Sequence, residues 1–248
     1  MRTALQALRS ILFIAVMYLA MVLMTLYFIL PAMLTEDGAF RAIRSYCRFV
    51  RWAARVIVGL RSEIRGDVPT EEVIIASKHQ SFFDIIMIVS AVPRPKFIMK
   101  KQLTYTPIVG YFARKTGCIP VDRGKRGVAI KRMVADVKAG RAQPGQLIIF
   151  PQGTRVAAGA QLPYKIGTGV LYRETEQRVV PAATNVGVFW PRHGIMRRPG
   201  LAVVEFLPAI EPGLEMADFM AALEDAVETR SDALMAEAGF GGGNNAGD

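Results

Sequence analysis

The hydrophobic pattern begins with one long apolar segment and then changes to short apolar runs separated by amphipathic ones. Residues 11–30 are twenty residues without a charge. As a helix they cover about 30 Å, the thickness of a bilayer hydrocarbon core. A cleavable signal peptide has an apolar stretch of only about 7–15 residues, followed by a small-residue cleavage site. No convincing site follows Leu30, so the pattern predicts an uncleaved membrane anchor.

The next segment carries arginines along one side of a predicted helix. They recur at intervals of three, four, three and four residues, at Arg41, Arg44, Arg48, Arg51 and Arg55. With aromatic and aliphatic residues between them, this pattern is typical of a helix in the headgroup plane; a charged face packed on the following domain would look the same. Pro31 and the acidic loop Glu36-Asp37-Gly38 are expected to separate the two helices. Either a hairpin that dips into one leaflet or a single full span fits, and the arginines place the remaining chain on the cytoplasmic side.

From about residue 62 the pattern alternates between strands and helices. Strands are expected at 72–77, 96–100, 118–121, 147–151, 179–184 and 202–207. Helices are expected at 82–92, 107–116, 125–140, 166–176 and 214–237. This order predicts an α/β fold with a mixed, largely parallel sheet flanked by helices, preceded by a membrane-associated helical hairpin. The expected regions are anchoring helices at 1–61, the α/β domain at 62–238 and a glycine-rich disordered tail at 239–248.

Composition and charge narrow the class of partner. Hydrophobic residues make up 52% of the chain and its mean hydropathy is +0.27. The first 210 residues hold 30 basic and 12 acidic residues, whereas residues 211–248 hold nine acids and one base. A basic, hydrophobic body favours an anionic membrane surface or a phosphorylated ligand over nucleic acid. The two cysteines offer neither a disulfide framework nor metal-ligand spacing, so no metal is expected.

His79 is the leading candidate for a general base, because the chain has only two histidines. It follows an expected strand, and Asp84 lies five residues later, early in an expected helix for which Ser81 is a plausible N-cap. Asp84 is therefore predicted to fold back and orient the imidazole. A helix cap with no catalytic part is the competing interpretation. His193, the rival base, has no carboxylate within nine residues, and Cys118 as a nucleophile would lie in a buried strand.

Basic and glycine-containing segments also follow other expected strands. They are Lys100–Lys101, the segment 117–123 that ends in Arg123, and the segment 150–155 that ends in Arg155. In open α/β sheets ligands bind beyond the carboxyl ends of the strands, so these segments are expected to share one crevice with His79. Serine-hydrolase, Walker A and dinucleotide signatures are missing.

Four segments in order resemble the PlsC-type glycerolipid acyltransferases, specifically the 1-acyl-glycerol-3-phosphate acyltransferases. His79 to Asp84 is similar to the family's H-x4-D motif, and Gly117 to Arg123 to its second block. Phe150 to Arg155 is similar to its F-P-E-G-T-R block, and Val180-Pro181 with Asn185 to its fourth. The resemblance covers roughly residues 70–190.

The resemblance implies acyl transfer from acyl carrier protein or coenzyme A to the sn-2 hydroxyl of lysophosphatidic acid, giving phosphatidic acid without a cofactor, metal or acyl-enzyme. His79 would be the base and Asp84 its orienter. The residues implied to bind substrate are Lys101, Arg123, Gln152, Gly153, Thr154, Arg155 and Pro181. We expect a membrane-bound protein, in a bacterial inner membrane, with its site on the cytoplasmic face.

Two departures from the family pattern leave the acceptor open. Gln152 stands where the family usually has glutamate, and Lys78 where it often has asparagine. Another lysolipid, such as lyso-ornithine lipid, is therefore an alternative acceptor. A membrane-surface lipid-binding protein without catalysis is the alternative from another class.

Overall fold

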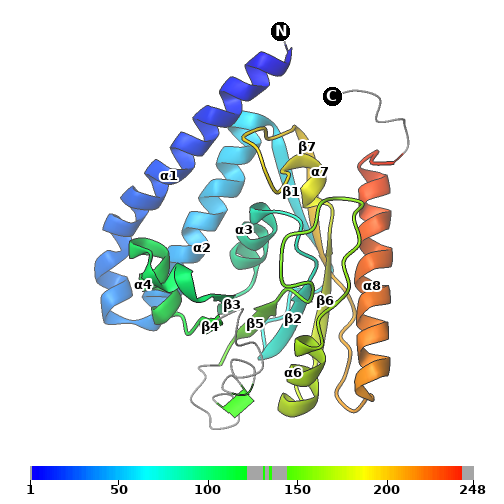
Figure 1. The fold of residues 1–248 in the computed structure, drawn as a ribbon. Helices are drawn as coiled ribbons and strands as arrows, with labels where there is room; N and C mark the ends of the chain where they lie inside the picture. Colours follow the sequence, from blue (N-terminus) through cyan, green and yellow to red (C-terminus); the bar gives the residue numbers. More distant parts are fainter. Residues whose placement is uncertain (1, 122–130, 132–133, 136–143, 242–248) are drawn as a thin grey trace.

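The computed structural model describes residues 2–121, 131, 134, 135 and 144–241, and it shows one sheet between two helical layers (Figure 1). The sheet order is β1-β7-β6-β2-β5-β3-β4. The strands are β1 (Leu60–Arg65), β2 (Val73–Ser77), β3 (Pro95–Lys100), β4 (Ile119–Val121), β5 (Gln146–Ile149), β6 (Val179–Thr184) and β7 (Gly200–Phe206). The five strands from β6 to β4 run parallel, and β7 pairs antiparallel to β6. The expected mixed, largely parallel sheet is confirmed.

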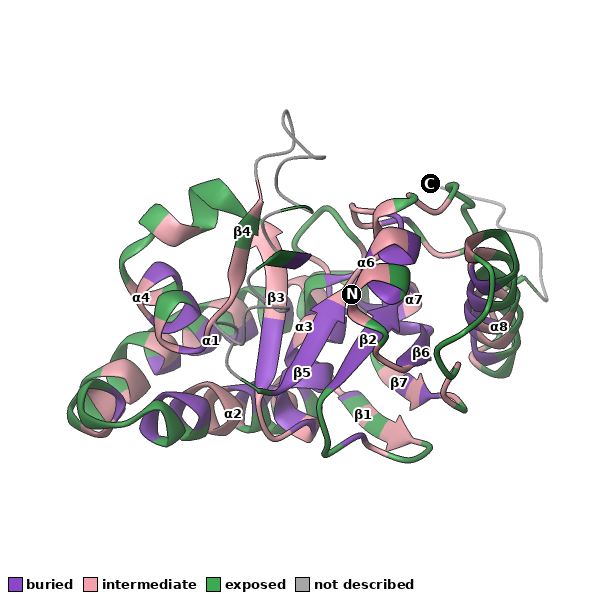
Figure 2. Ribbon diagram, turned by 90° about the horizontal axis from the view of Figure 1, so that it is seen from below, coloured by how far each residue is buried: buried purple, intermediate pink, exposed green. Residues whose placement is uncertain are grey.

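Helices cover both faces of this sheet, which explains why its central strands are apolar runs. Val73 and Ile75 of β2 pack in one core with α1 (Arg2–Leu34), α2 (Glu36–Ala53) and α3 (Phe82–Ala91). Ile74 and Ala76 point the other way, into a core with α6 (Gly167–Thr175) and α8 (Met216–Glu237). Figure 2 shows β2, β5 and β6 buried between these layers. Side chains that alternate into two cores are what a doubly covered strand requires.

The two N-terminal helices form a tight hairpin, and its turn differs from the expected one. Pro31 lies inside α1, and Glu36 and Asp37 form the first turn of α2 rather than a loop. Thr35 is the N-cap, because its hydroxyl accepts a hydrogen bond from Gly38 N at 2.9 Å. Acidic residues are favoured in a first helical turn. A Cβ on Gly38 would collide with the Pro31 carbonyl of α1, so the close contact of the two helices requires glycine there.

The arginine stripe is divided between solvent and the protein. Arg41, Arg48 and Arg55, seven residues apart, are exposed. Arg51 turns inward and donates hydrogen bonds to the hydroxyls of Ser62 and Ser90, each at 2.8 Å. Burial lowers the pKa of the Arg51 guanidinium. Helix α2 therefore packs between α1 and α3 instead of lying free in a headgroup layer.

Most expected elements are present, within a few residues of their expected bounds. The main strand missed is β1, which pairs parallel to β7 at the sheet edge. Its residues alternate apolar and charged instead of forming an apolar run, as befits an edge strand. The π-helix η1 (Ala54–Val58), the 3-10 helix η2 (Lys101–Tyr105) and the short α7 (Val186–Phe189) were also not expected. The helix α4 (Pro107–Lys115) was expected, whereas the helix expected at 125–140 falls mostly outside the described residues.

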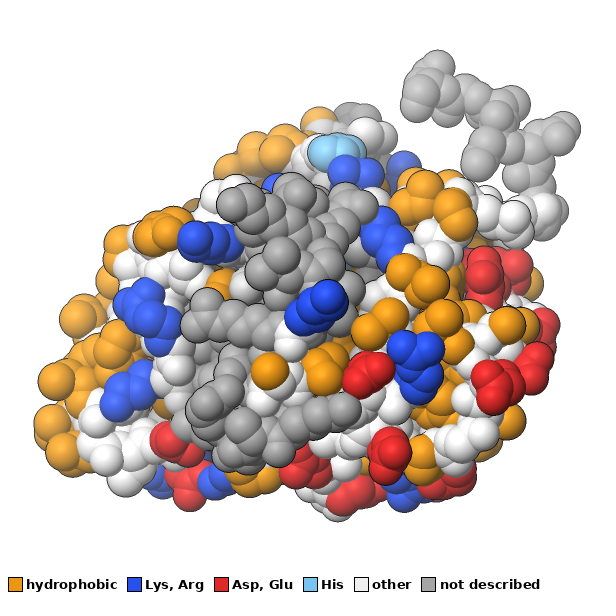
Figure 3. Space-filling view, turned by 60° about the horizontal axis from the view of Figure 1, so that its bottom comes forward, with side chains coloured by type: hydrophobic (Ala, Val, Ile, Leu, Met, Phe, Trp, Pro, Cys, Tyr) orange, Lys and Arg blue, Asp and Glu red, His pale blue; other side chains and the backbone are white. Residues whose placement is uncertain are grey.

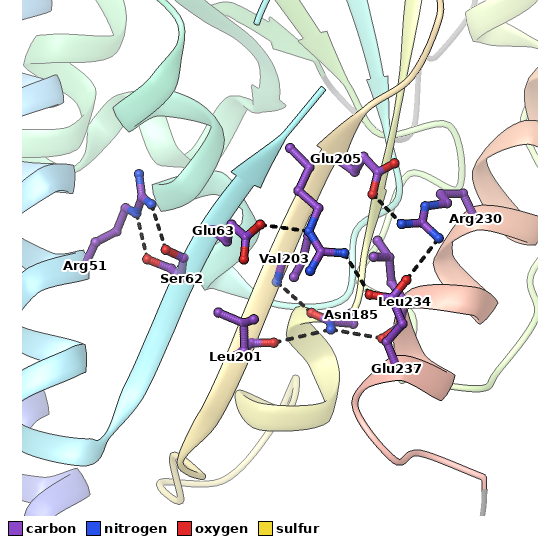
Figure 4. Close-up of polar contacts among 11 residues, drawn as sticks. Arg51, Ser62, Glu63, Asn185, Leu201, Val203, Glu205, Arg230, Leu234 and Glu237 are labelled. Atoms are coloured by element: carbon purple, nitrogen blue, oxygen red, sulfur yellow. Dashed lines mark hydrogen bonds and ion pairs between the residues drawn. The ribbon is translucent and has the colours of Figure 1, made fainter. Parts of the chain in front are cut away.

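Polar contacts join α8 to strands β6 and β7 (Figure 4). Asn185, just after β6, accepts a hydrogen bond from Val203 N at 2.7 Å and donates to the carbonyl oxygens of Leu201 and Leu234. Arg230 of α8 pairs with Glu205 at 2.8 Å and Glu237 at 3.1 Å. Asn185 therefore fixes β6, β7 and α8 against one another. Figure 3 shows the molecule with the lower side of Figure 1 turned forward. On this face, acidic side chains gather toward the α8 side, hydrophobic ones lie at the α1 side, and lysines and arginines lie between them.

Candidate active site

The loop between β2 and α3 places His79 against Asp84. The imidazole Nδ1 lies 3.0 Å from Asp84 Oδ1 and 3.2 Å from Oδ2. The same carboxylate accepts hydrogen bonds from Gln80 N and Ser81 N, each at 2.8 Å. Ser81 caps α3 by accepting from Phe83 N, which completes a capping box. Asp84 thus both caps the helix and contacts the imidazole, and the catalytic roles of the two residues stay predictions.

The two side chains of this pair differ in their exposure to solvent. The Asp84 side chain is fully buried, whereas the His79 side chain is 13% exposed. Two backbone N–H groups donate to this buried carboxylate, and these hydrogen bonds fix its position beside the imidazole. Asp84 accepts from Nδ1–H, which leaves Nε2 as the nitrogen with a free lone pair. The imidazole can therefore take a proton from a hydroxyl at its Nε2 edge.

The segment after β5 packs directly on His79. The ring of Phe150 stacks on the imidazole with ring centroids 3.9 Å apart, and Val156 N donates a hydrogen bond to the His79 carbonyl at 2.7 Å. Between these contacts the chain forms a turn in which Gly153 N donates to the Phe150 carbonyl at 2.8 Å. Proline suits the second position of such a turn, and Gly153 has φ +67°, a conformation that favours glycine. Gly153, Thr154 and Arg155 are thereby held beside the candidate base.

The other predicted substrate-binding residues come from several different elements. Arg155 donates a hydrogen bond to the Arg192 carbonyl at 3.2 Å, and Arg192 donates to the Arg155 carbonyl at 3.0 Å. Lys101 is exposed and begins η2, at the carboxyl end of β3. Pro181 is buried in β6 and lines a groove of about 610 Å³ together with residues of α8. Arg123 lies outside the described residues. The roles of these residues stay predictions.

Gln152 points into the protein, where it meets a cluster that the sequence did not indicate. Its side chain is 1% exposed. Its Nε2 donates to the Leu162 carbonyl at 3.2 Å and to Glu228 Oε1 at 3.4 Å. Tyr164 donates its hydroxyl to the same oxygen at 2.9 Å, and the buried Lys78 forms an ion pair with Glu228 Oε2. Glu228 lies on α8, remote in sequence, so no local pattern links it to the site.

Trp190 is a second residue that the sequence did not single out. Its ring stacks on Phe83 of α3 at 5.2 Å and meets Phe13 of α1 edge-on at 5.5 Å. The guanidinium of Arg197 lies 4.2 Å above the ring, and burial lowers the pKa of Arg197 to about 10. Trp190 therefore connects the start of α3, which carries the capping box of Asp84, to the apolar helix α1.

The competing nucleophile and base are placed less favourably. His193 is exposed, and in the described part of the chain no ion pair includes it. Burial raises the pKa of the Cys118 thiol, which disfavours a nucleophilic thiolate. Among the described residues no three acidic, histidine or cysteine side chains gather as metal ligands would. The predicted absence of a metal stays a prediction.

Comparisons with known proteins identify the family and the fold. The acyltransferase family model matches residues 60–185. The chain is 30% identical over 209 residues to a 1-acyl-sn-glycerol-3-phosphate acyltransferase of Pseudomonas aeruginosa, covering 83% of this chain and 81% of that protein. It is 28% identical over 200 residues to the alpha form from Mus musculus, covering 77% and 70%. The crystal structure of the 1-acyl-sn-glycerophosphate acyltransferase PlsC from Thermotoga maritima superposes with a TM-score of 0.80 at 18% identity, covering 95% of this chain and all of that chain.

Proposed function

This chain belongs to the acyltransferase family, and from that premise we propose that it acylates the sn-2 hydroxyl of lysophosphatidic acid to give phosphatidic acid. The PlsC-type family that the four segments suggested is confirmed, and the relatives are enzymes with this named activity. The observation that carries the assignment is the His79–Asp84 pair, with Nδ1 and Oδ1 3.0 Å apart beside the turn at 150–155. The acyl donor is a thioester of acyl carrier protein or coenzyme A.

The mechanism follows from the free Nε2 of His79. As the acceptor hydroxyl attacks the thioester carbonyl, Nε2 takes the hydroxyl proton, and Asp84 stabilises the imidazolium that forms. The tetrahedral intermediate then expels the thiolate, the carbon–sulfur bond breaks, and the imidazolium returns the proton to sulfur. The ester is formed without a bond between the acyl group and the protein. Proton transfer of this kind contributes about 10²–10⁴-fold to a rate.

The phosphate of the acceptor is held by basic side chains around the same crevice. Arg155 follows the turn that packs on His79, and Lys101 follows β3 at the same edge of the parallel strands. Arg123, outside the described residues, belongs to the same proposed set. Guanidinium groups bind phosphate through paired, charge-assisted hydrogen bonds. Arg155 keeps further N–H donors beyond the one it gives to the Arg192 carbonyl.

The packing of α1 supports the membrane position that we propose. One side of α1, including Phe13 and Met17, is buried against the body, and Gln6 Nε2 donates to the carbonyl oxygens of Val58 and Arg197. The opposite side exposes large apolar residues along the helix. A helix bound to the body over its length suits a hairpin that dips into one leaflet better than a separate full span. The site then faces the cytoplasmic surface of a bacterial inner membrane. Replacing Leu26 on the exposed side of α1 by glutamate should weaken binding of the protein to anionic vesicles. A Leu26→Glu variant that stays fully bound would contradict this placement.

Gln152 is the observation that favours a second candidate acceptor. If the glutamate usual at this position served the acceptor, its replacement by a neutral, buried amide favours another lysolipid. Competition between lysophosphatidic acid and lyso-ornithine lipid in one assay with purified enzyme separates the two acceptors.

The function is tested by replacing the base. In a strain lacking lysophosphatidate acylation, the wild-type chain should restore growth and His79→Ala should not. With purified protein, His79→Ala should lower turnover by about 10²-fold or more while the fold is kept. His193→Ala, at the exposed second histidine, is the matched control and should keep full activity. Full turnover in folded His79→Ala would show that the reaction does not use His79 as its base, whereas no turnover in the wild-type protein would indicate a lipid-binding protein without catalysis.

A further inference from the structure

A buried cluster of polar side chains lies behind the candidate active site. Its members come from three separate parts of the chain: Lys78 precedes His79, Gln152 and Tyr164 flank the loop after β5, and Glu228 belongs to α8. The Lys78 side chain is 1% exposed and the Glu228 side chain 18%. Glu228 Oε2 pairs with Lys78 Nζ, while Oε1 accepts from Tyr164 at 2.9 Å and from Gln152 at 3.4 Å. One carboxylate therefore receives hydrogen bonds from all three other members.

Each donor in the cluster depends strongly on Glu228. A lysine ammonium without water is tolerated only beside an opposite charge, and among the described residues Glu228 is the one ion-pair partner of Lys78. Burial and the nearby carboxylates of Glu228 and Glu224 raise the pKa of Tyr164, so its hydroxyl stays a donor. Gln152 Oε1 is buried without a hydrogen-bond partner among the described residues. The Gln152 side chain is thus held through Nε2 alone, by the Leu162 carbonyl and Glu228.

Two of the three residues that Glu228 holds are sequence neighbours of predicted site residues. Lys78 is bonded in sequence to His79, and its own N–H donates to the Ala182 carbonyl of β6 at 3.0 Å. Gln152 is bonded to Gly153, the glycine at φ +67° that starts the phosphate-binding side of the turn. The base and the turn come from different strands, β2 and β5. A single carboxylate from α8 therefore bridges the two strand ends from behind.

We propose that Glu228 is a positioning residue for acyl transfer, which fixes the distance between His79 and the turn at 150–155. This inference rests on the proposed function, because it concerns the acceptor that the two segments hold together. The hydrogen bonds of Glu228 go to Lys78, Gln152 and Tyr164 and, among the described residues, not to His79 or Asp84. It acts through Lys78 on the base and through Gln152 on the turn, so its loss lets both segments move. A displacement of about 1 Å at a reacting centre can cost as much as about 10²-fold in rate.

The test is a kinetic comparison of Glu228→Gln with the wild type. Glutamine keeps the size and one acceptor oxygen but removes the charge that holds Lys78. At a temperature well below its unfolding midpoint, we expect Glu228→Gln to raise KM for lysophosphatidic acid about tenfold and to lower kcat, with KM for the acyl-coenzyme A donor within about twofold of wild type. A purely structural role would lower the unfolding midpoint without this separation of the two KM values. Acceptor KM and kcat both within about twofold of wild type in the folded variant would overturn the proposal.

Glu237→Gln is the matched control on the same helix. It is the same change of a carboxylate to an amide, and Glu237 forms ion pairs with Arg65 and Arg230 and is not among the residues that line the groove at Pro181. Its replacement should leave the KM for lysophosphatidic acid unchanged. An equal rise in acceptor KM in Glu237→Gln would mean that any disturbance of α8 has this effect, and it would also overturn the proposal.

A second variant decides the question if Glu228→Gln does not fold. The double substitution Lys78→Met with Glu228→Leu removes both buried charges, and apolar replacement of a buried ion pair is often neutral for stability. The bridge to Gln152 and Tyr164 is lost in this variant too, so the raised acceptor KM should persist. Wild-type acceptor KM and kcat would refute the positioning role. Failure of the proposed function is distinguishable, because then the wild-type protein itself would not acylate lysophosphatidic acid.

Discussion

Replacing Asp84 by asparagine separates its two roles, which the structure assigns to different contacts of one carboxylate. The carboxylate accepts from Gln80 N and Ser81 N at 2.8 Å and lies 3.0 Å from His79 Nδ1. Asparagine has one acceptor oxygen and one NH2 group. If its oxygen keeps the backbone donors, its NH2 group faces Nδ1. The imidazole must then accept at Nδ1 and carry its proton on Nε2, where the mechanism needs a lone pair.

The expected magnitudes differ for the two roles. A charge-assisted hydrogen bond contributes about 1.5–3 kcal/mol and a neutral one about 0.5–1.5 kcal/mol, so Asp84→Asn should lower stability by about 1–2 kcal/mol. For a chain of this size that is a fall in Tm of about 2–8 °C. The wrong imidazole tautomer should lower kcat by about 10²–10⁴-fold. The loss of turnover is therefore far larger than the loss of stability explains.

The assay follows thiol release from acyl-coenzyme A with lysophosphatidic acid in detergent, alongside thermal unfolding by circular dichroism. Ser81→Ala is the matched control, because it removes the hydroxyl that accepts from Phe83 N and leaves the Asp84 carboxylate in place. It should cost about 1 kcal/mol and keep kcat. The reasoning is refuted if Asp84→Asn lowers Tm as expected but keeps kcat within about threefold of wild type, since Asp84 would then only cap α3.

Three further results are expected. Arg155→Ala should raise KM for lysophosphatidic acid about tenfold or more, as loss of a charge-assisted phosphate contact implies; an effect on the acyl donor alone would contradict phosphate binding. Gly38→Ala should lower Tm by several degrees, at about 1–3 kcal/mol, because the added methyl meets the α1 backbone; an unchanged Tm would show that the hairpin adjusts freely. Burial raises the pKa of the thiols of Cys47 and Cys118, so at about pH 7.5 neither should react with a thiol reagent before unfolding, and rapid labelling of native protein would contradict the packing.

Patterns that depend on neighbouring residues could be predicted from the sequence. The apolar run at Val73–Ser77 predicts a strand that is covered on both faces, and in the structure all of its residues are buried. The His79–Asp84 contact could be predicted because strand, loop and helix cap are consecutive. Strand β1 was missed because an edge strand buries few of its side chains, although Leu60 and Ile64 alternate with charged residues. The segment Glu36-Asp37-Gly38 suggests a loop by its composition, but the negative charge of Glu36 and Asp37 stabilises the start of α2 instead.

Contacts between distant segments could not be predicted in this way. Gln152 and Glu228 are 76 residues apart, and Lys78 and Glu228 are 150 apart. The sequence predicted a substrate contact for Gln152, and the structure directs its side chain toward α8. A buried lysine beside a buried glutamine signals a carboxylate partner only once the fold shows which helix covers them. Long-range charge pairing of this kind has no period along the chain.

The connection between the N-terminal helices and the sheet is a single residue, Gly59, between η1 and β1. Trp190 joins the same helices to the start of α3 through its contacts with Phe13 and Phe83. Among the described residues these contacts join α1, which we propose binds the membrane, to the segment that carries the candidate site, so we expect the two to tilt together on a bilayer. Lysolipid would then reach the site by lateral diffusion, and a flexible insertion at Gly59 should weaken this coupling.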